Sequence, residues 1–119
     1  MRADLTTSPS LYHRFHAITP AADRAAGLVA YESNISKALI FNRSRCQAKA
    51  ARARQLAMYL AHVVLGQSLT AVGYAFGRDR TTVSHACAVI EDMRDDPDFD
   101  AEVSRLESIL ETDAVAAHA

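Results

Sequence analysis

Residues 76–87 have the sequence Phe76-Gly77-Arg78-Asp79-Arg80-Thr81-Thr82-Val83-Ser84-His85-Ala86-Cys87, in which a turn signal is followed by the start of a helix. Gly77 predicts a sharp turn, and Asp79 is suited to cap a helix that begins directly after it. The charged and hydroxyl side chains at this start offer varied hydrogen-bonding groups. In a helix-turn-helix protein, this end of the second helix enters the major groove of DNA. DNA reading is therefore the first hypothesis that this stretch supports.

A second helix is predicted before the turn, and the two together make a helix-turn-helix. Gly66 fits the position after a preceding helix, Ser68 is a good cap, and the largely apolar residues 69–76 follow. After the turn, the helix face expected to be buried contains Val83, Ala86, Cys87, Ile90 and Met93. The residues expected nearer the outside are Arg80, Thr81, Ser84 and His85.

Further helices are predicted on both sides of this motif. Thr19-Pro20 is suited to start a helix that runs to about residue 33, and Asn34 interrupts it before Ser36 caps a short helix over residues 37–41. A long helix is expected from about residue 48 to residue 65, and its predicted inward residues are Leu56, Leu60, Val63 and Val64. A last helix is expected after Asp96-Pro97, with a buried face of Phe99, Val103, Leu106 and Leu110.

Length and composition agree with a single all-α domain. The chain has 119 residues, of which 50% are hydrophobic, with only four glycines and three prolines. This length suits one domain with its own core, and abundant alanine without β-branched runs favours helix. We expect a flexible N-terminal arm over residues 1–18, a helical domain over residues 19–112, and a flexible tail over residues 113–119.

The net charge of -1 conceals an asymmetric distribution. Residues 43–90 carry seven basic side chains and one acid, a net of +6, whereas residues 91–119 carry ten acids and two arginines, a net of -8. The segment from Asn42 to Arg45 is either a solvated loop or a basic arm that contacts phosphate or the minor groove. Basic residues also crowd the start of the long helix, where they oppose the helix dipole, so phosphate, an acidic partner or solvation could compensate them.

Other classes of function have weaker support in the sequence. His13 and His16 lie three residues apart without further ligands nearby, so a surface or packing role is expected rather than a metal site. Cys46 and Cys87 are far apart, which suits unpaired cysteines. No paired carboxylates, catalytic triad or metal constellation is apparent, and we expect neither an enzyme nor a cofactor. No apolar run approaches a membrane span, and residues 1–10 lack a signal-peptide core.

The run from Ala51 to Val83, ARARQLAMYLAHVVLGQSLTAVGYAFGRDRTTV, followed by residues 84–87, resembles the C-terminal DNA-binding domain of the bacterial replication initiator DnaA. The segments RQLAMYL and FGRDRTTVSHA carry this resemblance, which extends more weakly from about Leu28 to about Glu111. The resemblance implies a small, Trp-repressor-like helical domain with a helix-turn-helix.

The resemblance also implies a set of DNA contacts. The residues that match the family's base readers in the major groove are Asp79, Arg80, Thr81 and Thr82. Arg43 matches an arginine that enters the minor groove. The positions that match phosphate contacts are Arg45, Arg54, Gln55, Thr82 and His85. Double-stranded DNA is therefore the expected partner, together with replication or transcription proteins, and no membrane or nucleotide is expected to bind.

The chain departs from the family pattern at several positions. Gly77 stands alone before Arg78, where the family usually has two glycines, so the entry angle of the following helix could change. Arg80 replaces a usual histidine and favours guanine N7 and O6. About three extra residues lie between Arg45 and Arg52. Val89 replaces a basic residue, which predicts fewer phosphate contacts and a shallower salt dependence. No GxxxxGK[ST] loop is present, so ATP-driven origin opening by this chain alone is not expected.

Two hypotheses follow. The first is a stand-alone, sequence-specific DNA-binding protein that occupies initiator-type boxes or related sites, regulates replication initiation or transcription, and is cytoplasmic and nucleoid-associated. The alternative is a protein-interaction module that keeps the fold but has lost specific DNA binding, and that uses its N-terminal arm or its acidic last helix to bind a partner.

Overall fold

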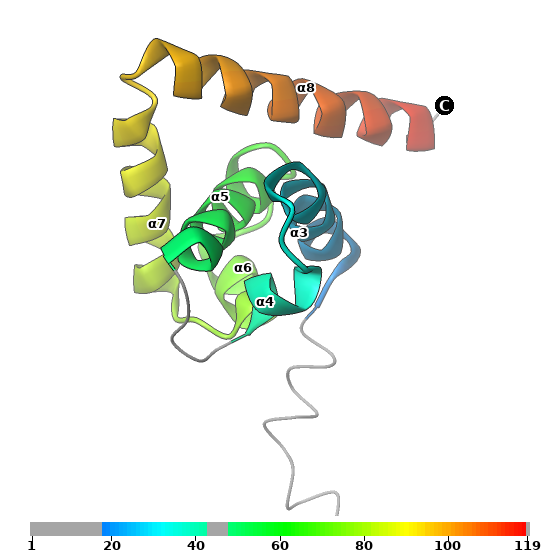
Figure 1. The fold of residues 1–119 in the computed structure, drawn as a ribbon. Helices are drawn as coiled ribbons and strands as arrows, with labels where there is room; N and C mark the ends of the chain where they lie inside the picture. Colours follow the sequence, from blue (N-terminus) through cyan, green and yellow to red (C-terminus); the bar gives the residue numbers. More distant parts are fainter. Residues whose placement is uncertain (1–17, 43–47, 119) are drawn as a thin grey trace, which may run out of the picture.

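The computed structural model describes residues 18–42 and 48–118. All regular secondary structure in this part of the chain is α-helical (Figure 1). The helices are α3 (Pro20–Ser33), α4 (Lys37–Phe41), α5 (Ala48–Val63), α6 (Leu69–Phe76), α7 (Arg80–Met93) and α8 (Pro97–His118). No strand occurs among the described residues. The prediction of an all-α fold is therefore confirmed.

The predicted helix starts are confirmed by their caps. The side chains of Thr19, Ser36, Ser68 and Asp79 each accept a hydrogen bond from the backbone N–H three residues later, at 3.1, 3.2, 3.0 and 2.8 Å respectively. Each bond satisfies one N–H at a helix start that has no partner within the helix. Four helices thus begin directly after a polar side chain that caps their first turn.

The predicted interruptions have the backbone conformation that their residues favour. Asn34 ends α3 in the left-handed region with φ of 57°, and Gly77 ends α6 in the same region with φ of 68°. Asparagine tolerates this region better than most residues, and glycine has no side chain to clash there. The chain therefore reverses sharply at both positions.

Helix α5 is the central element of the fold. Helices α3, α4, α6 and α7 all pack on it. Helix α8 begins near the C-terminal end of α7 and crosses over α3 (Figure 1). Arg105 of α8 lies 2.6 Å from Glu32 of α3 on the outside of this crossing. The largest side chains of the core are Val29, Ile40, Met58, Leu60, Val72, Phe76, Val83, Ile90, Val103, Leu106 and Leu110.

Three of the four large apolar residues that the sequence predicts to point inward from the long helix do so, since Leu60 is buried and Leu56 and Val64 pack against the core. Val63, expected to point inward, is 47% exposed, and the prediction for this residue is wrong. The centre of the buried face is formed by small residues, namely Ala50, Ala53, Ala57 and Ala61. Val63 lies at the edge of that face, at the last residue of the helix.

Helix α8 continues to His118, beyond residue 112, where we expect a flexible tail to begin. Its start agrees with the prediction, because Asp96 Oδ1 accepts a hydrogen bond from the N–H of Asp98 at 3.1 Å. Val103, Leu106 and Leu110 are buried as expected, and Phe99 packs against the core from a half-buried position. The predicted N-terminal arm lies almost entirely outside the described residues.

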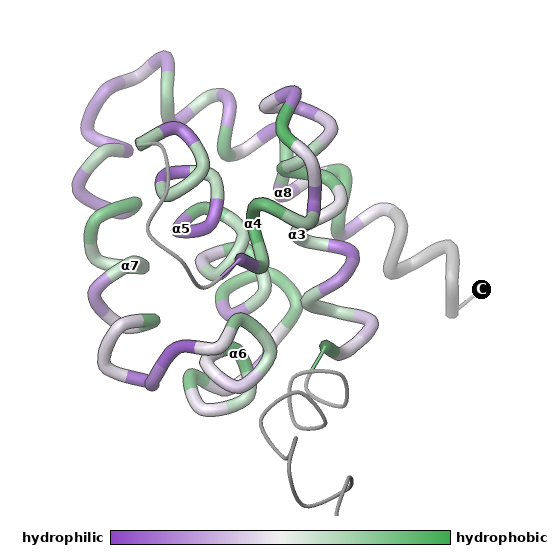
Figure 2. Tube along the Cα trace, turned by 60° about the horizontal axis from the view of Figure 1, so that its bottom comes forward, coloured by the Kyte–Doolittle hydropathy of each residue, from purple (hydrophilic) through white to green (hydrophobic). Residues whose placement is uncertain are grey.

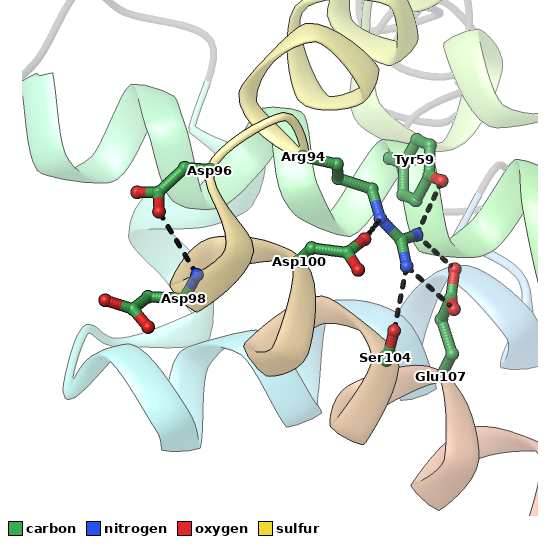
Figure 3. A network of polar contacts seen from close by, with 7 residues as sticks. All are labelled: Tyr59, Arg94, Asp96, Asp98, Asp100, Ser104 and Glu107. Atoms are coloured by element: carbon green, nitrogen blue, oxygen red, sulfur yellow. Dashed lines mark hydrogen bonds and ion pairs between the residues drawn. The ribbon is translucent and has the colours of Figure 1, made fainter.

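Arg94 holds the corner between α7 and α8 (Figure 3). Its guanidinium donates to Asp100 at 2.6 Å and to Glu107 at 2.8 Å, both on α8. It also donates to the hydroxyl of Ser104 and to the hydroxyl of Tyr59 on α5, each at 2.9 Å. One planar guanidinium can serve these partners together because its five N–H groups point in fixed directions.

Gly73 allows α6 to approach the turn that follows it. A Cβ atom at this position would lie 2.4 Å from the carbonyl oxygen of Arg78 and 3.2 Å from the carbonyl carbon of Asp79. The same close approach permits the N–H of Arg78 to donate to the carbonyl of Gly73 at 2.7 Å. The turn between α6 and α7 therefore depends on a residue without a side chain.

Replacing Gly73 with alanine is expected to lower the free energy of unfolding by about 1–3 kcal/mol, because backbone atoms rather than a flexible side chain would have to move. Gly27→Ala in α3 is the matched control, since the nearest atom there is Lys37 Cδ at 3.9 Å. The control should be neutral or stabilising by up to about 1 kcal/mol. Urea denaturation of both variants tests this, and equal losses would contradict it.

Arg94→Met is expected to lower the free energy of unfolding by about 1–2 kcal/mol, because partly shielded charged hydrogen bonds are lost and Glu107 keeps its charge. The side chain of Arg94 is only 19% exposed, whereas that of Arg105 is 48% exposed. Arg105→Met should have a much smaller effect, since exposed ion pairs contribute little. Thermal unfolding compares the two variants. An equal loss of stability would show that the partly shielded contacts of Arg94 stabilise the fold no more than the exposed ion pairs of Arg105.

Candidate nucleic-acid interface

Helices α6 and α7 form a helix-turn-helix with a short turn over residues 77–79. Gly77 ends α6 in a left-handed conformation, and the backbone N–H of Arg78 donates a hydrogen bond to the carbonyl of Gly73. Asp79 then starts α7 from an extended conformation with φ of -81° and ψ of 167°. The second helix of the motif consequently has both a fixed start and a fixed direction.

The first turn of α7 is exposed. Asp79, Arg80, Thr81 and Thr82 are all exposed, as is His85 one turn further along. Val83, Ala86 and Ile90 on the opposite face are buried in the core. Figure 2 shows the hydrophilic turn that leads from α6 into the start of α7. The four residues predicted to read bases in the major groove are therefore adjacent and exposed at the start of α7.

Asp79 keeps its charge in this position. Its Oδ1 atom accepts the N–H of Thr82 at 2.8 Å. Hydrogen bonds from the backbone of Thr82 and from its side chain lower the pKa of Asp79 below its ordinary value. An ionised carboxylate acts only as an acceptor, and cytosine N4 is the base group that carboxylates contact in the major groove.

The basic loop itself lies outside the described residues, and with it Arg43 and Arg45. The minor-groove contact of Arg43 and the phosphate contact of Arg45 stay predictions. The loop begins directly after Asn42, and the carbonyl of Asn42 accepts a hydrogen bond from Arg78 Nη2 at 3.3 Å. Asn42, the last described residue before the loop, therefore lies beside the turn of the helix-turn-helix.

Arg54 occupies a different environment from the one expected of a phosphate contact. It is only 7% exposed, and its Nε and Nη2 atoms donate to the carbonyls of Ile40 at 2.8 Å and Leu39 at 3.0 Å. Both carbonyls belong to α4. The phosphate contact stays a prediction, but this arrangement makes Arg54 first of all a link between α5 and α4.

Gln55, the other phosphate contact expected on α5, is half-buried. Its Oε1 atom accepts from Arg52 Nη1 at 3.0 Å, and the same Arg52 nitrogen lies 2.9 Å from Met93 Sδ at the end of α7. These contacts connect the start of α5 with the end of α7. The contacts of Gln55 and His85 with phosphate stay predictions.

Sequence reasoning did not find the parts played by Gly73 and Arg78. An isolated glycine inside the helix LTAVGYAF is a usable signal, since such a residue costs helix stability and often marks close packing. Arg78 carries no comparable signal. Its partner Asn42 lies 36 residues earlier in the chain, and only the packing of α4 against the turn brings them together.

Other kinds of site find little support among the described residues. No group of three or more His, Cys, Asp or Glu residues there could hold a metal ion, and His13, His16 and Cys46 fall outside this part. Cys87 is half-buried against the core. Burial raises the pKa of its thiol, and the negative charge of Glu91 raises it further. None of the described helices is long and apolar enough to span a bilayer.

Comparison with known proteins gives a consistent result. The family model described as bacterial dnaA protein helix-turn-helix matches residues 23–90, more than half of the chain. The chromosomal replication initiator protein DnaA of Laribacter hongkongensis (strain HLHK9) is 48% identical over 62 residues, which cover 50% of this chain and 13% of that protein. The protein of the same name from Acinetobacter baumannii (strain AYE) is 45% identical over 64 residues, which cover 52% of this chain and 14% of that protein.

The matches thus cover only a small part of these relatives. The family match over residues 23–90 includes α6, the turn and most of α7, which ends at Met93. The all-α architecture, the capped second helix of the motif and the family match agree with one another. The chain belongs to the bacterial DnaA helix-turn-helix family.

Proposed function

We propose that this chain binds double-stranded DNA sequence-specifically at initiator-type boxes or related sites, and thereby regulates replication initiation or transcription. The observation that carries the proposal is the exposed first turn of α7, which presents charged and hydroxyl groups from a rigidly held helix. The binding that we propose needs no nucleotide.

Contacts are divided among three elements in this proposal, one of which is α5 with the phosphate contacts predicted for Arg54 and Gln55. Asp79, Arg80 and Thr81 read base edges in the major groove, and Arg80 pairs with O6 and N7 of a guanine. Thr82 contacts both a base and phosphate, and His85 contacts phosphate further along α7. Arg43 enters the minor groove and Arg45 contacts phosphate.

The distribution of charge supports this division. The acidic residues of α8 follow the C-terminal end of α7, whereas Arg78 and Arg80 lie at its N-terminal end (Figure 1). Since α7 has 14 residues, these ends are about 20 Å apart. This exceeds the Debye length of roughly 8 Å at physiological salt, so repulsion between α8 and phosphates at the reading end is largely screened.

The proposal is tested by fluorescence anisotropy with two duplexes of equal length, one carrying an initiator-type box and the other a scrambled sequence. We expect a clear preference for the box, and Arg80→Ala should lose about 1–3 kcal/mol of discrimination at one guanine. Arg105→Ala on α8 is the control and should bind like the unchanged protein. Equal affinity for both duplexes, or no binding at low salt, would contradict the proposal and favour the protein-interaction alternative.

Asp79 has two roles in this proposal, because the carboxylate that caps α7 also faces the DNA. Asparagine caps a helix about as well as aspartate, whereas alanine does not. Substitution of Asp79 by each of these residues therefore separates the cap from the base contact.

Asp79→Asn should keep nearly the full stability at pH 7 but change base preference, whereas Asp79→Ala should lower stability and weaken binding. Because folding lowers the pKa of Asp79, its ionised cap stabilises the fold above the unfolded pKa of about 4 and is lost as pH falls through the folded value. The stability difference between the unchanged protein and Asp79→Ala should therefore shrink between pH 7 and pH 3. Thermal unfolding at both pH values measures this, and a constant difference would show that the charge of Asp79 does not matter.

A further inference from the structure

A cavity of about 490 Å³ is lined by residues of α3, α5 and α8. Its apolar lining includes Val29 of α3, Leu56 of α5, and Phe99 and Leu106 of α8. Val29 and Leu106 belong to the buried core, whereas Leu56 and Phe99 are only half-buried. Binding sites for small organic molecules are hollows of this size with a mostly apolar lining and a few polar groups.

The acidic side chains of the cavity already have a partner. Glu32 of α3 and Glu102 of α8 both line it. Arg105 Nη2 lies 2.6 Å from a carboxylate oxygen of Glu32 and 2.7 Å from one of Glu102. One guanidinium thus bridges the two carboxylates and offsets part of their negative charge.

The basic side chains of the cavity have no such partner. Lys49 and Arg52 of α5 line it and are both exposed. Lys49 forms no hydrogen bond or ion pair with any other residue that the structure describes. Arg52 Nη1 contacts only uncharged atoms there, namely Gln55 Oε1 at 3.0 Å and Met93 Sδ at 2.9 Å. The cavity therefore combines bridged carboxylates with cations that lack a carboxylate partner.

The position of these cations on α5 adds to the imbalance. Lys49 lies in the first turn of the helix and Arg52 three residues later, so both are near the positive end of the helix dipole and near each other. No acidic residue lies in that first turn. An anion bound beside these two side chains would be attracted by both cations and by the helix end.

We propose that this cavity binds a small organic acid, with its apolar body against Leu56 and Phe99 and its anionic group beside Lys49 and Arg52. The site lies outside the exposed first turn of α7 and uses none of the residues assigned to DNA contacts. It is therefore independent of the proposed function.

The head group of the ligand follows from the charges. If Glu32 and Glu102 dominated the cavity, an amine would bind best, and if all charges were only solvated, the head group would not matter. With Arg105 bridging the two acids, the anion has the advantage. Because Lys49 and Arg52 are exposed, the expected preference for an acid over an uncharged analogue is roughly fivefold.

The first experiment compares three compounds that share one apolar body, namely phenylbutyrate, phenylbutanol and phenylbutylamine. Each is titrated into the isotope-labelled full chain, and NMR shift changes give both affinity and location. Phenylbutyrate should bind roughly fivefold more tightly than phenylbutanol, and phenylbutylamine should bind most weakly. Shift changes should centre on the amides of Leu56 and Phe99, with α6 as the internal reference.

Salt gives a further readout of the same preference. At about 1 M salt the Debye length falls to roughly 3 Å, so the advantage of phenylbutyrate over phenylbutanol should shrink. Absence of phenylbutyrate binding, equal affinity for the acid and the alcohol, tightest binding of the amine, or shift changes centred on α6 would each overturn the inference.

The second experiment removes the cations. The double variant Lys49→Gln, Arg52→Gln should bind phenylbutyrate no more tightly than phenylbutanol, while its affinity for phenylbutanol stays the same. Lys49→Gln alone should lose part of the preference and disturbs no contact with the described residues. Lys37→Gln is the matched control, because this exposed lysine is paired with Asp23 and does not line the cavity.

The control should keep the full preference for phenylbutyrate. Preference retained by the double variant, or lost equally in Lys37→Gln, would overturn the inference, since net charge rather than the cavity would then decide. A dilution series without any compound tests whether a second copy of the chain fills the cavity. Concentration-dependent shifts at Leu56 and Phe99 would show that it does and would also overturn the inference.

Discussion

The contact between Gly73 and the backbone of Arg78 is the constraint on which the helix-turn-helix depends. It brings the carbonyl oxygen of Arg78 to where any side chain on residue 73 would begin, and it allows the 2.7 Å hydrogen bond from Arg78 to Gly73. Gly77, the residue before Arg78, has a left-handed backbone conformation that reverses the chain. Two glycines with different tasks therefore determine how α7 leaves the turn.

Features that depend on near neighbours in the chain could be predicted from the sequence. The caps at Thr19, Ser36, Ser68 and Asp79 act over three residues, so each is visible in a short stretch. The exposed face of α7 follows from the spacing of its apolar residues alone. The family resemblance, carried by two short segments, agrees with the match over residues 23–90.

Features that depend on distant neighbours could not be predicted in this way. Whether Arg54 points to solvent or into the protein is decided by carbonyls of α4, 14 and 15 residues earlier. The partners of Arg94 on α5 and α8 lie up to 35 residues away. For Val63, the large apolar residues were misleading, because alanines form the centre of the buried face of α5.

The corner at Arg94 also has an electrical consequence. By holding the acidic helix α8 at the end of α7 opposite to Arg80, it separates negative from positive charge along the molecule. A molecule with such a dipole moment is turned by the field of a polyanion before the two touch. For the DNA binding proposed above, this dipole favours encounters in which the N-terminal end of α7 faces the DNA.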